Sequence, residues 1–107
     1  MVTFRFNEFG TNLGTRQLGA AAREKLLPLL NGDERVILDF TGVDVVSNSF
    51  ADECIAKLLL EMELSELKKR TTFRGLNQVA ANSVLTALQR RHLAICQAQY
   101  SVFQYKT

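Results

Sequence analysis

Hydrophobic and polar positions alternate along some stretches of the chain and follow longer spacings along others. Residues 2–6 alternate between apolar and polar side chains, which predicts a half-buried strand. Residues 36–40 form an almost unbroken apolar run rich in branched side chains, which is typical of a strand covered on both faces. A short strand is expected over residues 71–75. Alternation from Tyr100 to Tyr105 predicts a last strand at the edge of the sheet, with its aromatic side chains covering the core.

The glycines and asparagines of residues 7–14 indicate a loop. After it, apolar residues spaced three and four apart predict a first helix. Thr15 is its expected N-cap. Pro28 lacks a backbone donor and clashes with the preceding turn, so we expect this helix to end or kink near Leu27. Its basic residues are expected on or near the face opposite the core: Arg16, Arg23 and Lys25.

Two further helices are predicted after Ser49 and after Asn77, and both serve as expected N-caps. The second helix should run to the basic residues 68–70 and the third to residues 90–92, because cations complement the negative end of a helix dipole. The expected inward residues are Ala51, Cys54, Ile55, Leu58 and Met62 in the second helix, and Ala80, Ala81, Val84, Leu85 and Leu88 in the third.

This alternation of strands and helices predicts an α/β fold with crossover connections. We expect a single-layer, mostly parallel sheet of about four strands with three helices. The length of 107 residues fits one domain spanning residues 1–107.

Composition narrows the range of functions. The net charge of +2 and the absence of a long basic run do not indicate binding to nucleic acid or to an anionic membrane. The first residues lack the apolar segment of a signal peptide, so we expect a cytoplasmic protein. Cys54 and Cys96 lie in separate apolar segments and are expected to be reduced thiols in the core.

The polar residues Ser47-Asn48-Ser49 stand between a short apolar run at 43–46 and the second helix. With Ser49 as N-cap, Asp52 occupies the position of the reciprocal residue in a capping box. Asp52 and Glu53 would then place negative charge at the positive end of the helix dipole. A hydroxyl-rich tip at the end of a central strand is a common place for function in open α/β folds.

The strand Leu38–Phe40 together with the segment Val45–Glu53 resembles the STAS domain, the fold of anti-sigma-factor antagonists. The resemblance covers roughly residues 35–93 and is closer to a STAS-like family of unknown function. In the antagonists the loop reads Asp-Ser-Ser-Gly, and a kinase of the histidine-kinase-like ATPase fold phosphorylates the first serine. Here Ser47 and Asn48 take the positions of the aspartate and that serine, Ser49 matches, and Phe50 replaces the glycine.

The resemblance implies a small bacterial regulatory protein that docks on a protein partner, such as a histidine-kinase-like ATPase, under control of serine phosphorylation. A phosphate on Ser47 or Ser49 would be repelled by the neighbouring carboxylates. The candidate partner-binding and phosphoswitch residues are Ser47, Asn48, Ser49, Phe50, Asp52 and Glu53.

Asp39 and Asp44 are expected to support this loop, with Asp39 accepting hydrogen bonds from its backbone or hydroxyls. Asp39, Asp44, Asp52 and Glu53 are also potential cation ligands, but they alternate with apolar residues, and we expect no metal and no cofactor. The single histidine, His92, supports neither a histidine metal site nor a catalytic triad, so we expect no enzyme.

Two alternatives remain open. The first is a nucleic-acid-associated accessory domain with an arginine patch formed by Arg70, Arg74, Arg90 and Arg91. The second is a structural dimerisation module that uses an apolar line off the main helical stripe, formed by Leu60, Leu64 and Leu67.

Overall fold

Three parallel strands form the main sheet of this computed structural model, which describes the backbone of residues 1–106 and the side chains of residues 1–98. The strands are β1 (Val2–Arg5), β3 (Val36–Asp39) and β5 (Thr71–Arg74), in the order β1-β3-β5. In this register Leu38 of β3 lies between Phe4 and Phe73. The predicted strands at 2–6, 36–40 and 71–75 are confirmed, each with its end one residue earlier.

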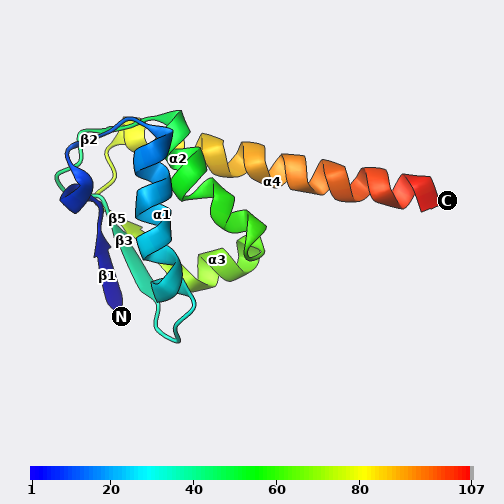
Figure 1. Cartoon of the computed structure of the whole chain (residues 1–107), viewed down its shortest axis with the longest axis horizontal. Helices are drawn as coiled ribbons and strands as arrows, with labels where there is room; N and C mark the ends of the chain where they lie inside the picture. The colour runs from blue at the N-terminus through cyan, green and yellow to red at the C-terminus, as the bar shows by residue number, and fades with distance from the viewer. Residues whose placement is uncertain (107) are drawn as a thin grey trace.

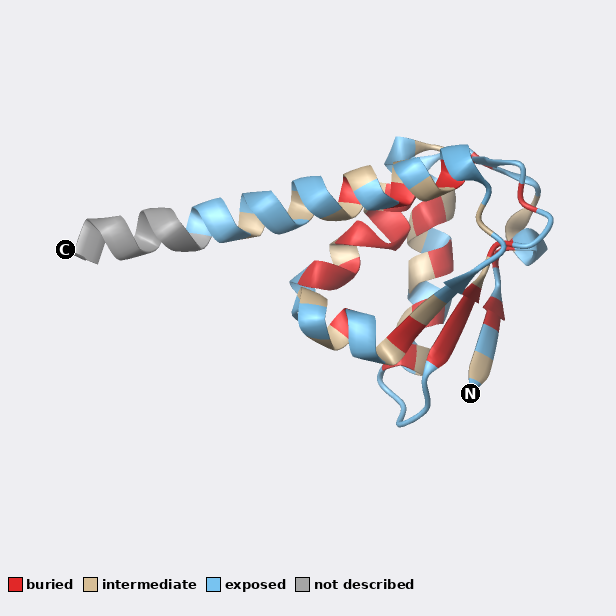
Figure 2. Cartoon of the chain, turned by 180° about the vertical axis from the view of Figure 1, so that it is seen from behind, coloured by how far each residue is buried: buried red, intermediate tan, exposed pale blue. Residues whose placement is uncertain are grey.

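The helices lie against one face of this sheet, and Figure 2 shows the sheet from the opposite side. Alternate residues of β3 therefore have different surroundings: Val36 and Leu38 belong to the main core, whereas Ile37 points to the outer face. The partners of Ile37 in register are Thr3 and Thr72. The central strand is buried, but helices cover only one of its faces.

The segment predicted as a loop contains a 3-10 turn, η1 (Phe6–Phe9), and a two-residue strand, β2 (Asn12–Leu13). β2 pairs in parallel with β4 (Val45–Val46) in a second small sheet. This sheet leads the chain directly into the polar residues before the next helix.

Helix α1 (Arg16–Leu30) begins as expected, because the Thr15 hydroxyl accepts a hydrogen bond from the Leu18 N–H at 3.1 Å. Of the two outcomes expected for Pro28, an end of the helix near Leu27 is wrong, since Pro28 lies within α1. Pro28 removes a single donor close to the helix end, and two more helical residues let Leu30 reach the core.

The predicted second helix is broken into three pieces: α2 (Asn48–Cys54), the 3-10 turn η2 (Ala56–Leu60) and α3 (Leu64–Arg70). Ile55 and Leu58 are fully buried and Leu59 nearly so, as expected, but Ala56 is fully buried as well. A straight helix buries one stripe, so the change of direction allows both sets of side chains to enter the core.

The predicted third helix and last strand are one helix, α4 (Gln78–Lys106). Asn77 caps it as expected, with its side-chain oxygen 2.8 Å from the Ala80 N–H. The strand at Tyr100–Tyr105 is wrong because residues 93–99 contain neither glycine nor proline, and nothing stops a helix that is already formed. The expected covering of the core by its aromatic side chains lies outside the described residues. Figure 1 shows α4 leaving the body of the domain and running far beyond it.

The fold class is therefore confirmed: α/β with parallel sheets and helices, consistent with a STAS-like fold. The described residues form a three-stranded and a two-stranded sheet with four α-helices, instead of about four strands and three helices.

Candidate functional site

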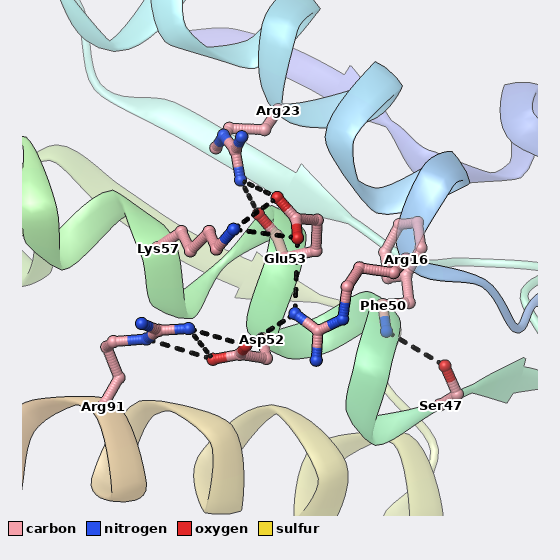
Figure 3. Close-up of polar contacts among 8 residues, drawn as sticks. All are labelled: Arg16, Arg23, Ser47, Phe50, Asp52, Glu53, Lys57 and Arg91. Carbon is pink, nitrogen blue, oxygen red and sulfur yellow. Dashed lines mark hydrogen bonds and ion pairs between the residues drawn. The ribbon is translucent and has the colours of Figure 1, made fainter. Parts of the chain in front are cut away.

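Ser47, not Ser49, caps helix α2. The Ser47 hydroxyl accepts a hydrogen bond from the Phe50 N–H at 3.0 Å (Figure 3). The backbone N–H of Ser47 donates to the Leu13 carbonyl at 2.9 Å. The small β2–β4 sheet therefore fixes Ser47 in an extended conformation, and the helix begins two residues earlier than expected. Asn48 and Ser49 form the exposed first turn.

Phe50 anchors this turn to the core. Its side chain is fully buried and meets the ring of Phe6 edge-on, with 6.2 Å between the ring centroids. Phe6 in turn stacks on Phe40 at 4.0 Å. Phe50 thus holds the start of α2 in place and presents no surface to a partner.

Asp39 and Asp44 support neighbouring turns in different ways. One oxygen of Asp39 accepts hydrogen bonds from the Thr41 N–H and hydroxyl, at 3.0 and 2.6 Å. The Thr41 hydroxyl holds the pKa of this carboxyl below its usual value. The expected bonds from the Ser47–Ser49 loop to Asp39 are not made, since Asp39 closes the turn after β3 instead. The backbone carbonyl of Asp44 accepts from the Asn77 side chain at 3.0 Å.

Glu53 is a charged side chain in the interior, only 6% exposed. Its carboxylate is 2.6 Å from Arg23, 3.0 Å from Lys57 and 3.3 Å from Arg16, and Arg23 also donates to its backbone carbonyl (Figure 3). Burial opposes ionisation, but hydrogen bonds from Arg23, Lys57 and Arg16 outweigh it and hold the pKa of Glu53 at about 2. Glu53 therefore remains charged in the folded protein.

Asp52 joins helices α1 and α4 to α2. Arg16 donates to it at 2.8 Å, and Arg91 holds both of its oxygens, at 2.9 and 2.7 Å. Burial raises the pKa of Asp52, but the hydrogen bonds from Arg16 and Arg91 together have the larger effect. The pKa of Asp52 therefore lies below its usual value. These contacts, with those of Glu53, form a cluster that we call the Asp52–Glu53 cluster: Asp52, Glu53, Arg16, Arg23, Lys57 and Arg91.

Gly19 allows the cluster to form. A Cβ atom at this position would lie 3.0 Å from both the Glu53 Cβ and the Phe50 carbonyl oxygen. The missing side chain lets α1 approach α2 closely, so that Arg16 and Arg23, one helical turn away on either side, reach Glu53. Both arginines were expected on or near the face opposite the core; instead they lie on the side of α1 that packs against α2, where Arg16 is still half-exposed.

The cluster also changes the electrostatics expected for the loop. Because α2 begins at Asn48, Asp52 and Glu53 lie in its second turn, and the proposed capping box does not exist. Four basic side chains surround these two carboxylates, so the cluster carries a net charge of +2. The expected repulsion of a phosphate by Asp52 and Glu53 is therefore wrong in sign.

A pocket of about 420 Å³ lies beside the exposed turn, between α2, the start of α1 and the middle of α4. Asn48 and Ser49 line one side of it, and Arg16 and Asp52 lie at its boundary with the cluster. Its α4 wall consists of Thr86, Ala87, Arg90, Arg91 and Ala94.

The remaining candidates are dispersed. Arg70 donates to the carbonyls of Leu30 and Gly32, and Arg91 is held by Asp52, so the four arginines of the nucleic-acid alternative do not form one free patch. In the described part of the chain, no three His, Cys, Asp or Glu side chains come close enough together to hold a metal ion.

The apolar line of the dimerisation alternative is interrupted, since Leu67 is buried in the core while Leu60 is exposed. The two cysteines also differ. Burial raises the pKa of Cys54 to about 12, whereas Cys96 is exposed on α4, contrary to expectation, with its sulfur 3.7 Å from His92.

The sequence did not reveal that Arg16, Arg23 and Arg91 surround Asp52 and Glu53. One signal was present: Arg16 is the first residue of α1, where a cation opposes the helix dipole. A residue that conflicts with its local surroundings often has a tertiary partner, and for Arg16 these are Asp52 and Glu53.

Comparison with known proteins gives one match. A family model described as a STAS-like domain of unknown function (DUF4325) matches residues 19–80, which is more than half of the chain and includes most of α1, all of β3 and the whole Ser47–Glu53 segment. Neither the curated proteins nor the solved structures contain a match. Among the described residues, no helix combines the length and apolar character needed to cross a membrane. The chain therefore belongs to the family of STAS-like domains of unknown function.

Proposed function

We propose that this protein is a small regulatory domain that binds a protein partner through the Ser47–Ser49 loop and the helix that follows. The observation that carries this proposal is the exposed first turn of α2. Asn48 and Ser49 are accessible, while Ser47 and Phe50 on either side fix the backbone by a hydrogen bond and a buried ring. A preformed turn loses little conformational entropy on binding.

Two exposed apolar side chains lie near this turn. Val45 of β4 is 46% exposed and Val79, in the first turn of α4, is 72% exposed. The hydrogen bond from Asn77 to Asp44 ties the two segments together. Apolar side chains beside polar, accessible groups are typical of a protein contact surface. We define the docking face as Val45, Asn48, Ser49 and Val79.

Control by phosphorylation belongs to the proposal, and the geometry favours Ser49 as the acceptor. The Ser47 hydroxyl already caps the helix and is half-buried, whereas the Ser49 hydroxyl is exposed in the docking face. A phosphate adds a charge of about −1.5 to −2 at neutral pH. Such a charge in the centre of the face changes its complementarity to any partner.

The resemblance to anti-sigma-factor antagonists supports a histidine-kinase-like ATPase as the partner. In that family the corresponding loop is the contact surface and the kinase substrate. This chain has asparagine at the position of the phosphorylated serine and keeps the second serine as Ser49. We therefore propose that docking is retained and that the acceptor has moved by one position.

Affinity purification of the tagged protein from its native cells tests this proposal. Ser49→Arg places a large cation in the docking face, and Ser65→Arg is its matched control, because Ser65 is also an exposed serine at the second position of a helix, α3. We expect a partner that Ser65→Arg retains and Ser49→Arg loses. Loss of the partner in both variants, or in neither, contradicts docking through this face.

A further inference from the structure

The pocket beside the docking face contains more positive charge than its own carboxylate neutralises. Arg16, Arg90 and Arg91 line it together with a single acid, Asp52. Arg16 and Arg91 already hold Asp52, and among the described residues Arg90 makes no ion pair. A guanidinium without a carboxylate partner, next to a carboxylate that is already paired, is a favourable place for an added anion.

Spare donors remain even on the paired arginines. Arg16 contacts both carboxylates through one terminal nitrogen, and its side chain is 49% exposed. Arg91 uses Nε and one terminal nitrogen on Asp52, which leaves its other terminal nitrogen available. Since a guanidinium has five N–H donors, an anion in the pocket does not have to displace Asp52.

The uncharged lining adds further hydrogen-bond donors. Asn48, Ser49 and Thr86, whose side chains carry amide and hydroxyl donors, line the same pocket. Three guanidinium groups with hydroxyl and amide donors around them suit a tetrahedral dianion, which offers three terminal oxygens, better than a planar carboxylate with two oxygens and one charge. We propose that this pocket is a binding site for a phosphate monoester, with Arg90 as the main contributor of unpaired charge.

The phosphate can come from two sources that share this chemistry. One is a separate phosphate-bearing ligand. The other is Ser49 itself: a protein kinase transfers the γ-phosphoryl group of ATP, so that the Ser49 Oγ–P bond forms, the bond to the β-phosphate oxygen breaks, ADP leaves, and the hydroxyl proton is released. The phosphate on Ser49 would then bind in the pocket of the same molecule and hold α2 to α4.

Titration of the purified protein with inorganic phosphate, at ionic strength kept constant with chloride, tests the site without any partner. The arginine Nε–Hε signals in ¹H–¹⁵N spectra report on each guanidinium. Arg90→Gln is the test variant and Arg74→Gln the control, because Arg74 is an exposed arginine on β5 outside the pocket. A fourth sample carries phosphoserine at position 49.

We expect saturable shifts for Arg90 and Arg91, and an affinity about ten- to a hundredfold lower in Arg90→Gln but unchanged in Arg74→Gln. In the phosphoserine sample, loss of the response to added phosphate supports binding of the protein's own phosphate, and a retained response supports a separate ligand. Shifts that do not saturate, or equal losses in the two variants, overturn the proposal. The outcome of this titration does not affect the proposed docking function, which is measured by partner capture.

Discussion

Replacing Glu53 by glutamine removes the negative charge that three basic side chains share in the interior. The amide keeps nearly the same shape, so packing around it changes little. Arg23, Lys57 and Arg16, which contact the carboxylate at 2.6, 3.0 and 3.3 Å, then face a neutral group. Arg16 keeps Asp52 as a counter-ion, but Arg23 and Lys57 lose the carboxylate with which they pair, and partly buried cations without a counter-ion destabilise the folded state.

The size of the effect follows from the pKa of Glu53. Its fall from 4.5 to about 2 measures how strongly the fold favours the ionised form. One pKa unit corresponds to about 1.4 kcal/mol, so the folded protein owes about 3 kcal/mol to this charge. Loss of one partner from a buried ion pair costs about 3–5 kcal/mol in other proteins, which agrees.

Urea denaturation followed by circular dichroism measures this loss. A domain of this size has a slope of roughly 1–3 kcal/mol per molar urea, so the midpoint should fall by about 1–3 M. Glu66→Gln is the matched control, because Glu66 also pairs with a basic residue, Arg70, at 2.7 Å, but is 43% exposed. An exposed helical pair contributes about 0.3–0.5 kcal/mol, and the control should shift the midpoint by only tenths of a molar.

Equal midpoints for the two variants would contradict this prediction, because burial and the convergence of three cations should make Glu53 contribute more to stability than Glu66. If Glu53→Gln does not fold, Lys57→Gln replaces it. Lys57 is one of three cations around Glu53, and its loss should lower the midpoint by an intermediate amount.

Other predictions concern the close contact, the cap and acid stability. Gly19→Ala should lower the melting temperature by several degrees, because overpacking against the Phe50 carbonyl costs about 1–3 kcal/mol; an increase would contradict the close approach of α1 to α2. Ser47→Ala should destabilise the protein by about 1 kcal/mol and Ser49→Ala by less than about 0.5 in urea titrations, and the reverse order would place the cap at Ser49. Because the pKa of Glu53 is lowered, its stabilisation is complete above pH 4.5 and is lost as the pH falls toward about 2; Glu53→Gln should flatten this part of the stability–pH curve.

Local signals predicted part of the fold correctly. Thr15 and Asn77 cap their helices because each is followed directly by the helix whose N–H groups it satisfies. The apolar run at residues 36–40 predicted the central strand, since consecutive branched residues are typical of a buried strand.

Tertiary contacts decided the rest. Ser47 and Ser49 are equally good caps by composition, and the choice depends on the Leu13 carbonyl, which lies more than thirty residues earlier in the chain. Arg16 and Arg23 are ordinary surface residues on a helical projection until Gly19 brings α2 against that side of α1. The alternation from Tyr100 to Tyr105 suggested a strand. This segment instead continues helix α4, because no glycine or proline between them stops the helix.

Hydrogen–deuterium exchange of the protein, alone and with its captured partner, tests docking through the Ser47–Ser49 loop most directly. With the partner bound, we expect added protection from exchange in peptides covering residues 45–52 and the first turn of α4, where Val79 lies, and little change in α3. Added protection in α3 with unchanged exchange over residues 45–52 would contradict it.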